Sequence, residues 1–150
     1  MEPITELWHC LRRVRSLRFF AQSALVSGWH GVGTGSVVVS TPADSVLLFV
    51  ESGFWQPTRD RSLRFSNVFR WSQIDVHFIR LEHLRFGADH PVYLFDMTPA
   101  TKSEWTTVSP HLCEHDCYAA VLRLRETGLG LSWTVTGPKK QESIEYWYGW

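Results

Sequence analysis

Apolar and polar residues alternate from about residue 15 to the end of the chain. Leu131, Trp133 and Val135, for example, are separated by single serine and threonine residues. Because successive side chains of a β-strand point to opposite faces, a period of two predicts strands that bury one face. Clusters of turn-forming residues interrupt the alternation, for instance at 41–44 and 87–91. The pattern predicts about nine short strands joined by turns.

A helical period is confined to the start of the chain. Apolar residues there recur every three or four positions, which predicts one short amphipathic helix over residues 3–14. These residues are Ile4, Leu7, Trp8, Leu11 and Val14. Strands with no helices between them do not form parallel crossovers, and closing an antiparallel sheet removes its exposed edges. We therefore expect an all-β, antiparallel up-and-down barrel with the helix across one open end; a two-sheet sandwich is the alternative that alternation leaves open.

Length and charge narrow the class of protein. The 150 residues contain no linker-like stretch, so we expect a single domain over 1–150. Lysine and arginine (15) balance aspartate and glutamate (15), which argues against a nucleic-acid partner. No run of about 20 apolar residues and no secretory signal is visible, which argues against a membrane partner and against export. With an odd number of cysteines, 3, we expect a cytoplasmic protein with reduced thiols.

Glycine occupies every second position at Gly31, Gly33 and Gly35, so one face of the predicted strand has no side chains. Such a face allows sharp coiling or the close approach of another group. Two interpretations remain open: a wall thinned to admit a ligand, or a barrel corner against which an indole packs.

The segment 111–117 carries the most reactive side chains. On an unbroken strand, predicted here over 112–124, His111, Cys113, His115 and Cys117 share one face. They would span about 20 Å, too far for one tetrahedral metal site. We therefore predict none unless the strand bends or outside ligands such as His77 or His30 take part. A metal- or thiol-dependent enzyme centred here is the alternative function, with Asp116 orienting an imidazole. A bulge near 114–115 would direct His111, Cys113, Asp116 and Tyr118 to one region.

The sequence resembles a family of small, mostly bacterial proteins called domain of unknown function 6314. The motifs are His111-x-Cys113-x-x-Asp116-x-Tyr118, then Trp133-x-Val135-x-Gly137-Pro138-x-Lys140, and a last strand with Tyr146 and Tyr148. Looser matches are Gly31-x-Gly33-x-Gly35, Phe49-x-Glu51-x-Gly53 and Phe69-x-Trp71. The resemblance implies a small, closed, lipocalin-like barrel and no established activity. In the last strand Trp147, Tyr148 and Gly149 stand where the family tends to place a basic residue.

A second similarity points to haem. Trp29-x-Gly31-x-Gly33-x-Gly35 followed by Glu51-Ser52-Gly53-Phe54 is similar to the start of nitrobindin-type haem barrels. The carboxy-terminal half lacks the pattern that closes those barrels before their haem-ligating histidine. A haem-binding barrel is therefore a further alternative, and the sequence identifies no cofactor.

A barrel of this size either fills its interior or encloses one small ligand. Several aromatic residues are expected to face inward: Trp29, Phe49, Phe65, Phe69, Trp71, Tyr118 and Trp133. Charged residues beside the motifs would have to be paired if they face the lumen. We predict binding of a small hydrophobic ligand with a polar or charged end, and the rival is an internal salt-bridge network that binds nothing. The candidate site residues are Glu51, Arg70, Trp71, His111, Cys113, Asp116, Tyr118, Trp133 and Lys140.

Surplus aromatic residues suggest self-association. Phe54, Trp55, Trp147 and Trp150 are expected on the outer surface, where an apolar patch favours a protein contact. A homodimer is the form this contact would take.

Overall fold

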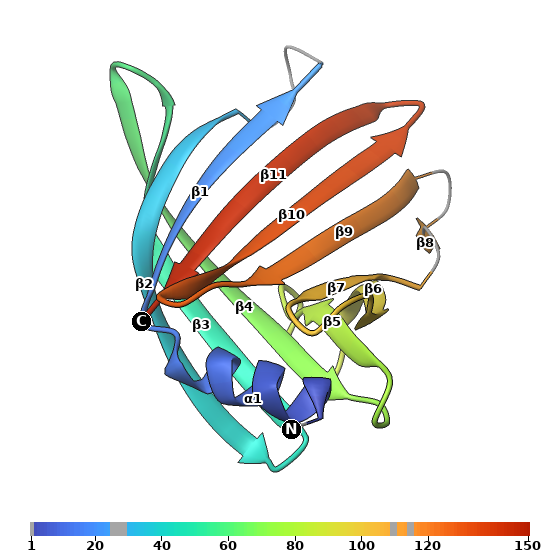
Figure 1. Ribbon diagram of the computed structural model, residues 1–150. Coiled ribbons are helices and arrows are strands. Elements are labelled where there is room, and N and C mark those ends of the chain that lie inside the picture. Colours follow the sequence, from blue (N-terminus) through green and yellow to red (C-terminus); the bar gives the residue numbers. More distant parts are fainter. Residues whose placement is uncertain (1, 25–29, 109–110, 114–115) are drawn as a thin grey trace.

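The computed structural model describes residues 2–24, 30–108, 111–113 and 116–150, which form one helix and eleven strands (Figure 1). The first elements are α1 (Pro3–Arg13), β1 (Ser16–Ser23), β2 (Gly31–Ala43), β3 (Val46–Thr58), β4 (Arg61–Gln73) and β5 (Ile79–His83). They are followed by β6 (Val92–Pro99), β7 (Glu104–Thr107), β8 (His111–Cys113), β9 (Asp116–Leu124), β10 (Gly128–Gly137) and β11 (Lys140–Gly149). The predicted all-β class and the single amino-terminal helix are confirmed.

The strands close into an antiparallel barrel. The hydrogen-bonded order is β10-β11-β1-β2-β3-β4-β5-β6-β7-β9, and β9 pairs with β10 to complete a ring of ten described strands. This closure excludes the sandwich, and the strand number differs slightly from the expected nine. Strand β8 lies outside the ring and pairs with the start of β9.

One predicted element is wrong. Residues 112–124 do not form an unbroken strand, because His111 pairs with Tyr118 and Cys113 pairs with Asp116 in antiparallel register. The chain therefore reverses between β8 and β9. The residues at the reversal, 114–115, lie outside the described part of the chain.

The alternation of the sequence matches the two faces of the barrel wall. Leu47, Phe49, Trp71, Phe95 and Leu122 have at most 1% of their surface exposed and form the centre of one core. Of the other aromatics expected inside, Phe69 is buried, and Phe65, Tyr118 and Trp133 are partly buried against the same core. Trp29 lies outside the described residues.

Helix α1 closes one end of the barrel (Figure 1). Its apolar stripe places Ile4, Leu7, Trp8 and Leu11 in the barrel core. The indole Nε1 of Trp8 donates a hydrogen bond to the backbone oxygen of Asp44, 3.2 Å away, in the turn between β2 and β3. The helix has 11 residues, and no helix within the described ranges is long and apolar enough to span a membrane.

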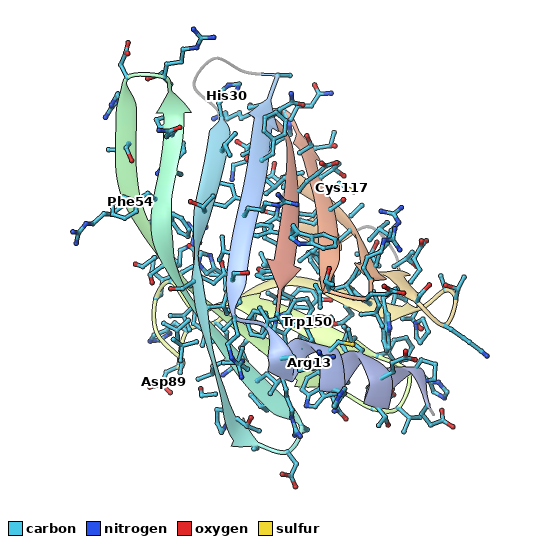
Figure 2. The ribbon with its side chains drawn as sticks, turned by 60° about the vertical axis from the view of Figure 1, so that its left-hand side comes forward. Arg13, His30, Phe54, Asp89, Cys117 and Trp150 are labelled. Atoms are coloured by element: carbon cyan, nitrogen blue, oxygen red, sulfur yellow. The ribbon has the colours of Figure 1, made fainter. Side chains whose placement is uncertain are left out.

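The surface aromatics do not behave alike. Phe54 is 52% exposed and points outward from β3, as Figure 2 shows. Trp55 is expected on the surface, but it is partly buried against the core. As the next residue of the strand, its side chain points to the face opposite that of Phe54. Trp150 packs against the core near α1, with the Arg13 guanidinium 4.7 Å from its ring centroid. The expected homodimer stays a prediction.

The glycine run of β2 allows close packing inside the barrel. A Cβ atom at Gly33 would overlap the ring of Phe19, and one at Gly35 would overlap the backbone oxygen of Ser52. The expected close approach is confirmed. The space above Gly33 is taken by the ring of Phe19, so the group that packs there is a phenyl ring and not an indole.

Candidate functional site

A cavity of about 350 Å³ enters the barrel between β4, β5, β6, β9, β10 and β11. It lies toward the end opposite α1, because its wall includes Lys140 at the turn from β10 to β11 (Figure 1). Its lining is Asn67, Phe69, His83, Arg85, Val92, Leu94, Tyr118, Trp133, Val135, Lys140, Glu142, Ile144 and Tyr146. Most of these residues lie at inward-facing positions of their strands, so the register of the barrel brings them together. Arg85 follows the end of β5, and Leu94 lies at a register shift on β6.

Aromatic rings form the inner wall of the cavity. Trp133 meets Phe69, Phe95 and Tyr146 edge to face, with centroids 6.3, 5.7 and 5.8 Å away. Its Nε1 is buried without a hydrogen-bond partner among the described residues. The ring of His83 stacks on Phe69 at 4.7 Å. Burial, and then the charge of Arg85, lower the pKa of His83, so this imidazole is neutral at pH 7 and adds to the aromatic wall.

The mouth of the cavity is charged. Arg85 and Lys140 are exposed there, and Glu142 is half-buried. Neither Arg85 nor Lys140 forms an ion pair with a described residue. Two cations against one carboxylate make this rim attractive to a negatively charged group.

A buried acid lies beside the inner wall. Glu51, on β3, has 0% of its surface exposed, and its Oε2 accepts a hydrogen bond of 2.6 Å from the Tyr148 hydroxyl. Burial raises the pKa of Glu51 to about 8; Tyr148 and Asn67 oppose this rise. Asn67 lies opposite Glu51 in the register, and Oε1 has no hydrogen bond of good geometry to a described residue. Glu51 is therefore mainly a neutral carboxylic acid at pH 7.

The neighbouring phenols are neutral as well. Burial, followed by the charge of Glu51, raises the pKa of both Tyr146 and Tyr148 above the ordinary range. Their rings stack at 5.4 Å with planes only 8° apart. This stack connects the cavity wall, to which Tyr146 belongs, with the acid that Tyr148 contacts.

Three of the predicted site residues lie together in the cavity wall: Tyr118, Trp133 and Lys140. Trp71 lies in the deep core, 1% exposed and edge to face with Phe49 at 6.1 Å, and is not part of this wall. Asp116 starts β9 two residues before Tyr118, so it has the same parity, but it does not line the cavity.

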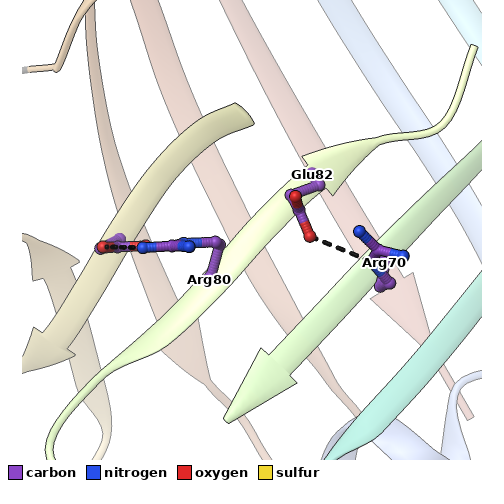
Figure 3. A network of polar contacts seen from close by, with 4 residues as sticks. Arg70, Arg80 and Glu82 are labelled. Atoms are coloured by element: carbon purple, nitrogen blue, oxygen red, sulfur yellow. Dashed lines mark hydrogen bonds and ion pairs between the residues drawn. The ribbon is translucent and has the colours of Figure 1, made fainter. Parts of the chain in front are cut away.

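Arg70 was expected to face the lumen, but its side chain does not. It lies between Phe69 and Trp71, whose side chains point inward, so its own side chain points outward. On the outer surface the Nε atom of Arg70 lies 3.0 Å from Oε1 of Glu82 (Figure 3). On the same surface, the guanidinium of Arg80 donates two hydrogen bonds to the carboxylate of Asp96, of 2.8 and 3.1 Å. Arg70 therefore cannot pair with Glu51 in an internal network.

The His/Cys segment gives no described metal site. The backbones of His111 and Cys113 lie beside Tyr118 and Asp116, but their side chains fall outside the described part of the chain. No group of three or more potential metal ligands occurs among the side chains that the structure describes. The metal, thiol and haem hypotheses stay predictions.

Residues 7–149 match the family described as "Family of unknown function (DUF6314)". The chain belongs to the DUF6314 family. No curated protein and no solved structure matches it. The two motifs that carried the resemblance lie on adjacent strands of this DUF6314 chain, with Tyr118 opposite Val135 and Gly137 opposite Lys140. They meet at the cavity mouth.

Several cavity residues of the DUF6314 chain were not among the sequence candidates. His83 and Arg85 come from β5 and the turn after it, where the alternation is too short to fix parity. Asn67 and Glu142 do carry a signal, because each lies two positions from an apolar inward residue, Phe69 and Ile144. The pattern that identifies them is a polar residue at a strand position where the alternation expects an apolar, inward-facing one.

Proposed function

We propose that this DUF6314 chain binds one small, largely apolar molecule with a negatively charged end. The observation that carries the proposal is the cavity of about 350 Å³ between aromatic walls and a cationic rim. Ligand sites are concave, mostly apolar and furnished with a few polar groups, and they start at about 300 Å³. A volume at the lower end of that range suits one compact molecule.

The apolar body of the ligand is expected to lie against Phe69, Trp133, Leu94 and Ile144. These side chains come from four strands of a closed barrel, so the wall needs little rearrangement when a ligand enters. Burial of apolar surface contributes about 25 cal/mol per Å², so this part of the ligand supplies most of the affinity.

The charged end is expected to lie between Arg85 and Lys140 at the mouth. Both are exposed, so pairing with a carboxylate there adds only about 0–1 kcal/mol. The charge therefore selects the orientation of the ligand and speeds its capture more than it strengthens binding. An apolar carboxylate is the ligand class that fits both parts of the cavity.

A cavity-filling variant tests this proposal. Val92 lines the cavity and is only partly buried, so Val92→Trp places an indole in the binding space with little overpacking of the core. We expect the variant to lose at least tenfold in affinity for aryl carboxylates such as 4-isopropylphenylacetate, measured by calorimetric titration.

Val50→Trp is the matched control. Val50 is 43% exposed on the outer face of β3, so the same substitution there leaves binding unchanged. Equal affinity of Val92→Trp and the wild-type chain, or no binding by the wild-type chain to any aryl or alkyl carboxylate, would overturn the proposal. Native mass spectrometry of protein purified from its own host would identify the natural ligand.

A further inference from the structure

A groove of about 420 Å³ lies on the outer face of the barrel, across the adjacent strands β9, β10, β11 and β1 (Figure 1). Its side chains alternate with those of the core. Arg18 follows the buried Leu17, and Trp147 lies between the buried Tyr146 and Tyr148, so both point outward. The groove and the inner cavity therefore lie on opposite sides of the same sheet.

The indole of Trp147 lies along the outer surface of β10. A Cβ atom at Gly128 would be 3.0 Å from Cζ2 of this indole, and one at Gly130 would be 3.9 Å from Cε3. Opposite corners of the six-membered ring thus lie over two successive outward positions of β10, where glycine has no side chain. One face of the indole is against the strand, and the other is left toward the groove, which Trp147 lines.

Guanidinium groups lie on both sides of this indole. Arg18 is opposite Trp147 in the register of β1 and β11, and its guanidinium carbon is 6.0 Å from the ring centroid, at the limit of cation–π attraction. On the other side, Arg123 is opposite Gly130 in the register of β9 and β10. Arg125 lines the groove from the turn after β9.

The groove carries a positive charge although the chain as a whole is neutral. Its acids are Glu145, which lines it, and Glu104, whose Oε2 is 3.2 Å from Nε of Arg123. Neither Arg18 nor Arg125 forms an ion pair with a described residue. Three arginines against two carboxylates favour an anion, and the planar guanidinium fork matches the oxygens of a phosphate or a carboxylate.

We infer that this groove is a second binding site, and that it takes a planar aromatic phosphate with the chemistry of a mononucleotide. The base stacks on the free face of Trp147, and the phosphate lies over Gly130 beside Arg123 and Arg125. Arg18 adds its charge from the other side of the ring. The site is separate from the inner cavity, so the inference does not depend on the proposed function.

Two properties of the groove favour a free nucleotide. A phosphate monoester carries a charge of about −1.5 to −2 at pH 7, more than a carboxylate, and therefore gains more from several arginines. A volume of about 420 Å³ suits one compact ligand. The neutral chain lacks the extended basic surface that a polynucleotide requires.

Three probes test the inference by calorimetric titration of the wild-type chain at low salt. Adenosine monophosphate has both recognised parts, adenosine lacks the phosphate, and ribose 5-phosphate lacks the base. Stacking on an aromatic ring and charge-assisted hydrogen bonds each strengthen binding substantially. We expect adenosine monophosphate to bind at least about tenfold more tightly than either of the other two probes.

Variants separate the contributions of the ring and the charges. Trp147→Leu should weaken binding of adenosine monophosphate by about fivefold or more and leave ribose 5-phosphate almost unchanged. Arg125→Gln should weaken binding of adenosine monophosphate by about threefold or more and leave adenosine unchanged. Glu145→Gln should strengthen binding of the phosphate, because it removes a repelling charge. Arg125 and Glu145 are exposed, so these two variants test the inference even where Trp147→Leu does not fold.

Two controls locate the site. Arg61→Gln removes an exposed arginine at the start of β4, outside the groove, and should leave binding of adenosine monophosphate unchanged. An effect as large as that of Arg125→Gln would show unspecific charge attraction and overturn the inference. Val92→Trp fills the inner cavity and should also leave nucleotide binding unchanged. A loss there would place the nucleotide inside the barrel and overturn the inference as well.

The remaining outcomes concern the ligand itself. No binding of adenosine monophosphate, or equal binding of adenosine monophosphate and ribose 5-phosphate, overturns the inference and leaves the proposed function in place. Single-stranded oligoadenylate that binds much more tightly than the mononucleotide would overturn the assignment to a free nucleotide.

Discussion

At the scale of single residues, Glu51 is the one acidic or basic residue that is buried among those that the structure describes. Its inward direction follows from the alternation around Phe49, and the sequence therefore predicts an acid inside the barrel. Its partner does not follow, because Tyr148 is 97 positions away and reaches Glu51 only through closure of the barrel. Local pattern indicates which face a residue takes, and the choice of partner depends on the whole register.

The raised pKa of Glu51 makes stability depend on pH. The pKa is about 8 in the folded chain against an ordinary value of 4.5, so the folded state holds the proton more tightly. The contribution of this group to stability is therefore fully present below about pH 4.5 and is lost as the pH rises through 8, by about 5 kcal/mol in all.

Glu51→Gln cannot ionise and should lack this loss. Denaturation with urea at pH 5, 6.5 and 8 should show the variant gaining on the wild-type chain at each step. Parallel stability profiles of the two proteins would contradict the prediction, because other titrating groups are common to both.

At the scale of elements, the sequence predicts the long strands well and the short ones poorly. The 13-residue strands β2, β3 and β4 contain enough alternation to fix their faces. Strand β7 has 4 residues and β8 has 3, too few for a period of two to be recognised. The reversal before β9 carries no Gly or Pro signal, so the sequence predicts a continuous strand there. The cavity residues on β5 were missed for the same reason.

The glycine run predicts a specific cost for adding one methyl group to β2. Gly33→Ala should lower the free energy of unfolding by about 1–3 kcal/mol, because its Cβ atom would overlap the ring of Phe19 in the packed core. Gly130→Ala on β10 is the control: the nearest atoms to its Cβ are 3.9 Å away. Urea denaturation of both variants measures the difference. Equal stability of the two would show that the Phe19 ring yields without cost.

At the scale of the whole molecule, the two ends of the barrel have different tasks. Helix α1 closes one end with its apolar stripe (Figure 1). The cavity lies toward the other end. The sequence predicts the helix and its place, but it does not predict which part of the lumen stays open. That depends on how the inward-facing side chains of all ten strands pack against one another, and no single segment contains this information.

This division predicts that stability and binding can be changed separately. Leu11 on α1 is fully buried, so Leu11→Ala should cost about 2–5 kcal/mol of folding free energy through the cavity it leaves. Thr5→Ala, on the exposed face of the same helix, should cost little. Because Leu11 does not line the cavity at the far end, both variants should bind the aryl carboxylates with the affinity of the wild-type chain under conditions where they are folded. Urea denaturation of both variants measures the change in stability, and calorimetric titration with the aryl carboxylates measures the affinity. A loss of affinity in Leu11→Ala that follows its loss of stability would mean that the lumen responds as one unit, and the ends would then not be independent.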